Sequence, residues 1–302
     1  MEPWVRYESI VDDVEDFEVA CRTPLPTVVR LNQIKTNHSR LRRALEAEGI
    51  GITPRSWNPH TLELDTPKPG RTWPYQHGWF IGQEEISQLP ARVLDPAPGS
   101  WVWDAAAAPG GKATQLAAMV RDSGVVVAND VNLGRLSALR SNADRLGVDN
   151  LVVTQQDART FSLAPFDVDS FDATLVDAPC SGEGTVRKNP HVIDEWNLEG
   201  VHSLSNLQTG ILRRAIQATK PGGTVVYATC TFAPEENEGV LSGIVESEPA
   251  TVEPYDLGLD HAPGLTEWQG TTYAPAVQHG KRFYPHQNDT GGFFCAKLRV
   301  EG

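Results

Sequence analysis

Two cysteines and an acid stand where apolar runs of the sequence end, and these residue types can carry out covalent chemistry. Asp177 and Cys180 follow the run 171–176, and Cys230 follows the run 224–228. An apolar run that ends in an acid, a turn and a cysteine is typical of a buried parallel strand that delivers reactive groups to its carboxyl edge. From these residues alone, Cys180 is a candidate nucleophile.

Similar placements follow three earlier apolar runs. After the run 101–104 comes a loop of small residues, after 125–129 comes Asp130, and after 151–154 comes Asp157. One acid after a strand is weak evidence for a site, because aspartate often caps the next helix. Five successive strand ends with such residues predict a ligand-binding edge of one sheet.

The elements that must position these residues alternate regularly. The five runs are predicted strands, and helices are predicted at 112–120, 133–146 and 201–219. Repeated strand–helix units imply a parallel sheet with right-handed crossovers, so we predict an α/β fold with a doubly wound sheet. The last apolar run, 293–298, is interpreted as an antiparallel addition.

The chain divides into two predicted parts. Residues 1–90 are predicted to form a small N-terminal α/β unit, and residues 91–302 to form the main domain. The small unit has a predicted strand at 27–31 and a helix capped by Ser39. The first turn of that helix carries three arginines, Arg40, Arg42 and Arg43. They fit either a solvated helix face or a contact with RNA.

The loop after the first strand indicates which cofactor the edge binds. Its small residues let the backbone approach a ligand closely. A phosphate-binding Walker A loop would need glycine at 106 and serine or threonine at 113, where the chain has alanine, and the glycine spacing of a nicotinamide site is also missing. An acid after the second strand suits a ribose diol, and an acid after the third suits an adenine amino group. S-adenosylmethionine (SAM), a nucleoside cofactor without phosphates, fits this pattern. The predicted cofactor-binding residues are Ala106, Ala107, Ala108, Pro109, Gly110, Gly111, Lys112, Asp130, Arg135, Asp157 and Asp177.

Four motifs give the sequence a family resemblance. They are Asp104 to Lys112, Asp177 to Gly184, Tyr227 to Thr231 followed by Pro234 to Glu238, and Gly292 to Phe294. Their order and spacing resemble the Nol/Nop/Sun family of RNA cytosine-5 methyltransferases over residues 75–300, and the segment 23–49 resembles that family's small N-terminal extension. The departures are Ala106, where the family usually has cysteine, and Ala228, where serine is common.

The resemblance implies a Rossmann-like class I methyltransferase that uses SAM to methylate carbon 5 of cytosine in RNA, with tRNA favoured over rRNA. Carbon 5 is too electron-poor to take a methyl group directly, so a thiolate must first add to carbon 6. By resemblance, Cys230 is that nucleophile and Cys180 serves in product release. Asp177 is then expected near both the cofactor and the cytosine, where it serves ring nitrogen 3 or simply holds the cofactor. Lys112 either lowers the pKa of a nearby thiol or stabilises the acids of the site, or it is an ordinary lysine at a helix start.

The net charge opposes a simple polyanion-binding role. The chain has 26 Lys and Arg against 39 Asp and Glu, a net charge of −13, so RNA binding needs local basic patches. Beyond the N-terminal unit, Arg187 with Lys188 and Lys281 with Arg282 could meet phosphates, although each pair also fits an ordinary polar loop. The acidic, lysine-poor composition is typical of halophilic proteins, so we expect an archaeal, halophilic, tRNA-type member of the family.

The sequence shows no sign of export or of a metal framework. No apolar stretch approaches the roughly 20 residues of a membrane span, and no signal peptide is visible. The four cysteines have neither zinc-ligand nor disulfide spacing. We therefore expect a cytoplasmic monomer without a metal site.

Two other classes of protein remain as alternatives. An amino-group methyltransferase usually has an aromatic clamp after the fourth strand, and the stretch 177–180 offers none. A non-catalytic RNA-binding or assembly factor could use the same fold in degenerate form. The presence of both cysteines and all the strand-end acids argues against that alternative.

Overall fold

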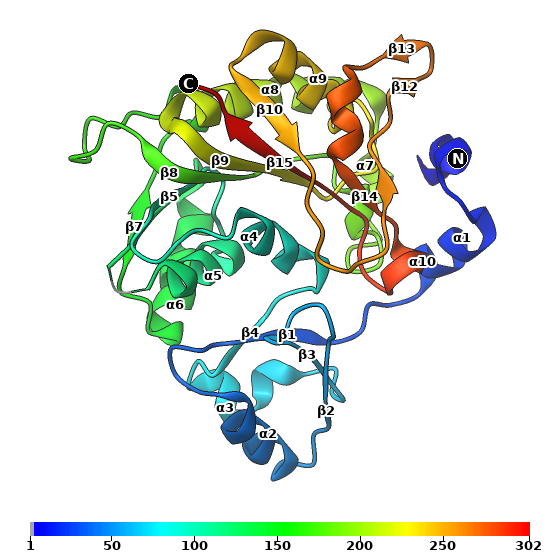
Figure 1. Ribbon diagram of the computed structural model, residues 1–302. Helices are drawn as coiled ribbons and strands as arrows, with labels where there is room; N and C mark the ends of the chain where they lie inside the picture. The colour runs from blue at the N-terminus through cyan, green and yellow to red at the C-terminus, as the bar shows by residue number, and fades with distance from the viewer. Residues whose placement is uncertain (1–2, 122) are drawn as a thin grey trace.

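The computed structural model describes residues 3–121 and 123–302 and shows a large sheet covered by helices, with a smaller sheet packed beside it (Figure 1). The large sheet has the order β11-β14-β15-β9-β8-β5-β6-β7, and β10 pairs with β15. Its strands are β5 (Trp101–Asp104), β6 (Val125–Asn129), β7 (Leu151–Thr154), β8 (Phe171–Asp177), β9 (Thr219–Thr229), β10 (Ala250–Glu253), β11 (Ala262–Pro263), β14 (Lys281–Phe283) and β15 (Phe293–Val300).

The strand directions confirm the predicted fold class. Strands β5 to β9 run parallel, and β15 lies antiparallel to β9, as expected for the last apolar run. From β5 the chain builds outward through β6 and β7, then returns to the other side of β5 as β8. This reversal between β5 and β8 is a topological switch point, where the carboxyl ends of doubly wound strands open a crevice for ligands.

Successive side chains along each strand point to opposite faces of the large sheet, and each face packs into its own hydrophobic core. Val102 and Val126 pack with helices α4 (Leu89–Leu94) and α5 (Gly111–Val120), whereas Trp103 and Val127 pack toward helix α8 on the opposite face. The other helices of this part are α6 (Leu133–Leu146), α7 (Val192–Glu195), α8 (Leu198–Ala218), α9 (Glu238–Ser247) and α10 (Pro285–Asn288). Because both faces of the sheet are buried, its strands read as continuous apolar runs in the sequence.

The small sheet is antiparallel, with the order β2-β3-β1-β4. Its elements are β1 (Val28–Leu31), α2 (His38–Glu46), β2 (Ile52–Pro54), β3 (Thr61–Leu64), α3 (Trp73–Gln76) and β4 (Phe80–Gly82). The expected cap of α2 is wrong: Asn37, not Ser39, is the N-cap, and its side chain accepts a hydrogen bond from the Arg40 amide at 3.0 Å. Ser39 lies inside the first turn.

Residues 3–22 pack away from the small sheet (Figure 1). The 3₁₀ helix Pro3–Ile10 and helix α1 (Val14–Arg22) join the core of the large part, where Phe17 contacts Phe232 and Tyr284 edge-on. The predicted boundary between an N-terminal unit (1–90) and a main domain (91–302) stays a prediction. The packing of the N-terminal segment against the large part does not follow that boundary. Among the residues that the structure describes, no helix could cross a membrane.

Candidate active site

The switch point brings polar and reactive side chains together from four elements, and three of these side chains are predicted from the sequence. Asp104 ends β5, Asp177 ends β8, Cys230 follows β9, and Lys112 lies in the first turn of α5. Two cavities meet here, and both are lined by Ala106, Asp177 and Cys230. Two of the catalytic residues expected from the sequence, Asp177 and Cys230, therefore face both cavities, and Cys180 lines one of them.

The two cysteine sulfurs are in contact. The Sγ atoms of Cys180 and Cys230 lie 3.2 Å apart, and the Cys230 amide donates to the Cys180 sulfur at 3.3 Å. Asp177 and Ala228 are register partners in β8 and β9, so these adjacent strands set the spacing of the two loops that follow. The hydrogen bond with Cys230 and burial together raise the pKa of Cys180 well above its usual value, which keeps Cys180 a thiol.

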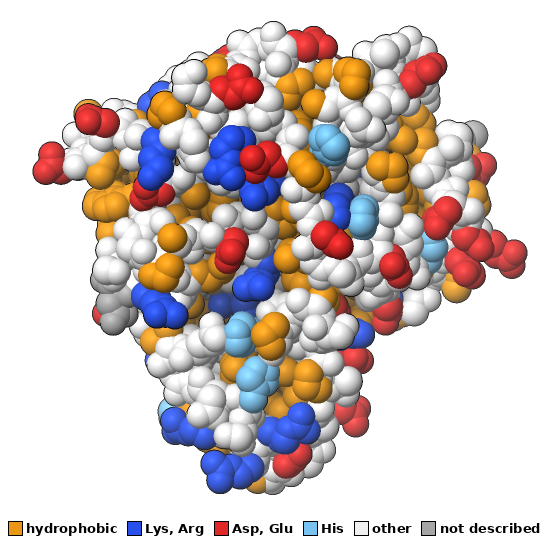
Figure 2. Space-filling model, in the orientation of Figure 1, with side chains coloured by type: hydrophobic (Ala, Val, Ile, Leu, Met, Phe, Trp, Pro, Cys, Tyr) orange, Lys and Arg blue, Asp and Glu red, His pale blue; other side chains and the backbone are white. Residues whose placement is uncertain are grey.

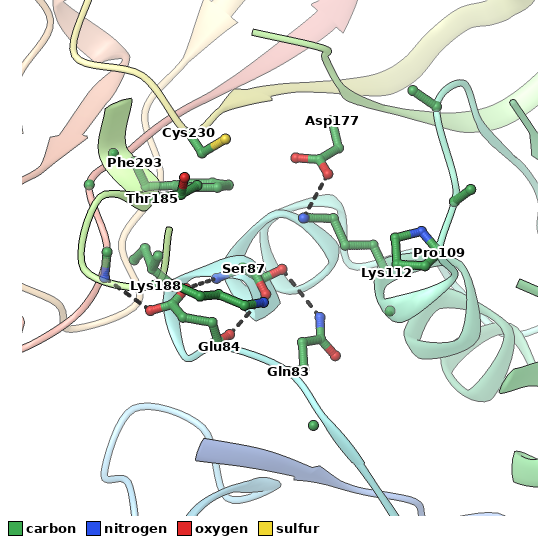
Figure 3. Close-up of a pocket in the computed structure, with 18 of the residues that line it drawn as sticks. Gln83, Glu84, Ser87, Pro109, Lys112, Asp177, Thr185, Lys188, Cys230 and Phe293 are labelled. Carbon is green, nitrogen blue, oxygen red and sulfur yellow. Dashed lines mark hydrogen bonds and ion pairs between the residues drawn. The ribbon is translucent and has the colours of Figure 1, made fainter. Parts of the chain in front are cut away.

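Lys112 is directed at Asp177, as Figure 3 shows. Its ammonium donates to Asp177 Oδ2 at 2.7 Å. Burial alone would lower the pKa of Lys112, but the Asp177 carboxylate more than offsets this and raises it, with a smaller contribution from Cys230. Lys112 is therefore a charged member of the site, and its interpretation as an ordinary lysine at a helix start is wrong.

Asp104 is a site residue that the sequence reasoning did not single out. Its side chain is inaccessible to solvent and lines one of the two cavities, together with Lys112 and Phe293, and neither carboxyl oxygen has a hydrogen-bond partner among the described residues. Burial and the neighbouring charge of Asp177 raise the pKa of Asp104 to about 8, so it holds a proton at neutral pH. Its place at a strand end was the available signal, but a strand-end acid alone does not reveal burial.

The first cavity has the features of a nucleoside site. Asp130 accepts hydrogen bonds from the Asn132 amide at 2.9 Å and the Ala108 amide at 3.3 Å, so its carboxylate is fixed at the end of β6. Arg135 pairs with Asp130 at 3.3 Å and donates to the Ala108 carbonyl, so it supports the small-residue loop. Asp157, at the far end of the cavity, pairs with Arg159.

Apolar side chains that the sequence reasoning missed form the walls of this cavity. Val131 is 63% exposed although it is apolar, and Pro179, Leu207 and Ile211 also line the space. Acids suited to ribose and adenine polar groups, with apolar walls between them, fit the adenosine part of SAM, and the small-residue loop leaves room for its methionine end. A single valine after a strand carries no recognisable signal, which is why Val131 was missed.

Asp130 gives a direct test of the cofactor cavity. We expect Asp130→Asn to weaken SAM binding about 10- to 100-fold, because an amide supplies one acceptor oxygen where the carboxylate supplies two and carries the charge. Isothermal titration with SAM measures this. Asp167→Asn is the matched control, since Asp167 is exposed in the loop before β8, at the amino end of the sheet. Unchanged affinity in the Asp130 variant would contradict the assignment.

The second cavity opens between the small sheet and the large one. It has a volume of about 270 Å³ and is lined from the small part by Gly82, Gln83 and Glu84, and from the large part by Lys188 and Phe293 among others (Figure 3). Lys112, Asp177 and Cys230 also face this space. It is the space through which a substrate group can reach the Cys230 sulfur.

The loops behind this cavity approach one another at backbone distance. The Gly184 amide donates to the Cys230 carbonyl at 3.0 Å, and the Gly292 amide donates to the Gly184 carbonyl at 2.8 Å. A Cβ on Gly184 would lie 2.3 Å from the Gly292 oxygen, so only glycine fits there. These contacts explain why the motifs around 180, 230 and 292 each contain small residues.

Three of the four cations for which a phosphate contact and an ordinary polar loop were both open are buried, which favours a structural role for them. Arg187 donates to the backbone carbonyls of Thr23 and Thr290. Arg282 pairs with buried Glu238, and Lys281 is 9% exposed. They tie segments of the fold together. Lys188 alone of the four is exposed, at the rim of the second cavity.

The structural role of Arg187 predicts a loss of stability. We expect Arg187→Met to lower the free energy of unfolding by about 2–4 kcal/mol, because the buried Thr290 carbonyl and the partly buried contacts with the Thr23 and Pro24 carbonyls lose their donor. Chemical denaturation measures this. Lys188→Met is the control, with an expected change within about 0.5 kcal/mol. If the Arg187 variant is as stable as the wild type and loses only RNA affinity, the prediction is wrong and Arg187 contacts an RNA phosphate instead.

A doubly wound sheet with an adenosine-shaped cavity at its switch point, beside paired thiols, defines a class I SAM-dependent methyltransferase. The chain belongs to the family of the 16S rRNA methyltransferase RsmB/F, whose family model matches residues 91–299. This confirms the resemblance to the Nol/Nop/Sun enzymes.

Similar proteins come from archaea and eukaryotes. The tRNA (cytosine(49)-C(5))-methyltransferase of Pyrococcus abyssi is 35% identical over 97% of this chain and 94% of its own length. The 25S rRNA (cytosine-C(5))-methyltransferase nop2 of Schizosaccharomyces pombe is 36% identical over 96% of this chain, which spans 48% of that protein. A solved methyltransferase homologue from Pyrococcus horikoshii superposes with a TM-score of 0.83, at 33% identity, over 94% of this chain and 90% of that one.

Proposed function

We propose that this RNA cytosine-5 methyltransferase acts on tRNA, through a covalent adduct between Cys230 and the base. The observation that carries the mechanism is the Cys180–Cys230 sulfur contact of 3.2 Å between two cavities, one suited to SAM and one open to a substrate. tRNA is favoured because the relative named for tRNA matches along nearly the whole of both chains. The relative named for 25S rRNA is about twice as long as this chain.

In this mechanism Cys230 attacks carbon 6 of the cytosine. The sulfur–carbon bond forms, and the electrons of the double bond between carbons 5 and 6 make carbon 5 nucleophilic. Asp177, held by Lys112, faces the same cavity, where its carboxylate accepts a hydrogen bond from the exocyclic amino group beside nitrogen 3 and orients the ring for attack. When bound, SAM supplies the electrophilic methyl group that carbon 5 takes.

Product release reverses the first bond. A base removes the proton from carbon 5, the double bond between carbons 5 and 6 forms again, and the bond from carbon 6 to sulfur breaks. Cys230 leaves as a thiolate. The Cys180 thiol, 3.2 Å away, donates a hydrogen bond to this departing sulfur and stabilises its charge. The raised pKa of Cys180 keeps that donor proton in place.

The small N-terminal part is proposed to bind RNA. Arg40, Arg42 and Arg43 are exposed on α2, and the Arg40 guanidinium lies 4.9 Å from the centre of the Trp79 ring. Figure 2 shows Lys and Arg side chains gathered at this end of the molecule, over α2 and α3. The clustering answers the need for a local basic patch on a chain of net charge −13. The target base must leave its stack to reach Cys230, so a loop or junction of folded RNA fits best.

Methylation of defined RNAs tests the proposal. The protein is incubated with SAM carrying a labelled methyl group and with either unmodified tRNA or rRNA transcripts, and bisulfite sequencing then locates the modified base. We expect label at carbon 5 of one cytosine position in tRNA. Label confined to rRNA would show that rRNA, not tRNA, is the substrate. Label on an exocyclic amine would overturn the proposed methylation of carbon 5.

Three further properties are part of the proposal. We propose a cytoplasmic monomer, and we propose that the acidic surface is adapted to a high-salt cytoplasm. A sample that is most stable and active in dilute buffer, with no gain from molar KCl, would rule out the adaptation to salt. Sedimentation at the same salt concentrations measures the oligomeric state.

A further inference from the structure

Glu236 is a buried acid next to the active site that the mechanism does not use. It lies six residues after Cys230, in the turn that precedes α9, and its exposed fraction is 0%. Its carboxylate is directed at the other cysteine loop: the Ser181 amide donates to Oε2 at 3.0 Å, and the single hydrogen of the Ser181 hydroxyl is shared between Oε1 and a carboxylate oxygen of Glu183. Glu236 therefore links the segment behind Cys230 to the residue that follows Cys180.

Gln208 extends this link to the other side of Cys180. Its side-chain amide, from α8, donates both to Glu236 Oε2 at 2.6 Å and to the Pro179 carbonyl at 2.8 Å. Pro179 and Ser181 are the two neighbours of Cys180. One carboxylate, with one amide bound to it, thus holds the backbone on both sides of the Cys180 sulfur.

We propose that Glu236 is a positioning residue for Cys180, which holds the Cys180 thiol against Cys230 and thereby sets the rate at which methylated RNA is released. The inference rests on the proposed function and goes beyond it by assigning a role to a residue outside the reacting atoms. It follows from where the contacts fall, since Glu236 touches the neighbours of Cys180 and neither cysteine sulfur.

The composition of the site supports a specific role over general packing. A buried carboxylate costs stability unless its oxygens accept good hydrogen bonds, so an acid at this position needs a reason. Burial raises the pKa of Glu236 to about 7, against the hydrogen bonds from Ser181 and Gln208 that lower it. The adjacent Glu235 offers a contrast, because its carboxylate pairs with Arg6 and accepts from Trp268, and among the described residues it has no hydrogen bond to the cysteine loops.

The test is Glu236→Gln, which keeps the shape of the side chain but replaces one acceptor oxygen with a donor. We expect adduct formation to proceed at the wild-type rate, and adduct breakdown and kcat to fall about tenfold; KM for RNA falls with kcat because the adduct accumulates, so kcat/KM stays unchanged. Single-turnover assays with the full chain follow denaturation-resistant adduct and released methylated RNA. Gln208→Leu removes the hydrogen bonds of the Gln208 amide to Glu236 and to the Pro179 carbonyl and is expected to give the same pattern. Glu235→Gln is the matched control and is expected to release RNA at the wild-type rate.

A double variant separates positioning from general damage. If Glu236 acts through Cys180, Glu236→Gln adds no further slowing of release in a Cys180→Ala background. Full additivity would overturn the inference, as would a wild-type release rate in both Glu236→Gln and Gln208→Leu. Equal losses of adduct formation and release would show a structural role and overturn it too. If the wild-type protein forms no adduct with any RNA, the proposed function itself fails, which is a distinct result.

Discussion

Cys230→Ala is expected to abolish both the covalent adduct with RNA and methyl transfer. Without a thiolate on carbon 6, carbon 5 of cytosine stays too electron-poor to accept the methyl group, so no other step of the mechanism can compensate. We expect activity to fall at least about 1000-fold, to the background of the assay. Labelled SAM with tRNA gives the methylation rate, and denaturing electrophoresis shows the adduct.

The control for this variant is Cys295→Ala. Cys295 is fully buried in β15 and takes no part in the site, so its loss is expected to leave adduct formation unchanged. Circular dichroism and SAM binding confirm that the Cys230 variant is folded. Adduct formed by the Cys230 variant would show that Cys180 makes the attack, which is the interpretation that the sequence gives before the family resemblance is considered.

Cys180→Ala is expected to have the opposite signature, with adduct that accumulates. The attack by Cys230 and the methyl transfer remain, but the departing Cys230 thiolate loses the hydrogen-bond donor 3.2 Å away. We expect turnover to fall about 100-fold, the scale of one lost donor to a developing anion, while close to one adduct per enzyme builds up.

Mass spectrometry of the trapped complex distinguishes the step at which the Cys180 variant stops. The adduct should carry the methyl group, because the block lies after transfer. An unmethylated adduct would place Cys180 before transfer, and normal turnover would remove it from the mechanism. Cys180→Ser supplies an intermediate case, since a hydroxyl can donate the same hydrogen bond, and it should release RNA faster than the alanine variant.

Much of the site could be predicted from the sequence because its signals are local. An apolar run followed by an acid or a cysteine marks the end of a buried strand, and the carboxyl ends of parallel strands share one edge. Asp130, Asp177, Cys180 and Cys230 were all placed in this way, and the five predicted parallel strands are the observed ones. The family motifs then gave the two cysteines their separate roles.

The basic residues show where such reasoning fails. Arg187 and Lys188 are neighbours in a polar loop and look alike in the sequence, yet the first is buried under three backbone carbonyls and the second is exposed. Those carbonyls belong to Thr23, Pro24 and Thr290, more than 100 positions away. No local pattern encodes such partners, because they meet only when the chain has folded.

By itself, the sequence determined the doubly wound sheet and the SAM-type edge and predicted the two-cysteine chemistry, since strand periodicity, turn residues and motif spacing are properties of short stretches of chain. Only the tertiary structure decided the 3.2 Å contact of the sulfurs, the buried and unpartnered Asp104, and the link from Glu236 to the Cys180 loop. Each of these depends on segments tens of residues apart that the packing of the sheet brings together, and burial then sets their hydrogen bonds and pKa values.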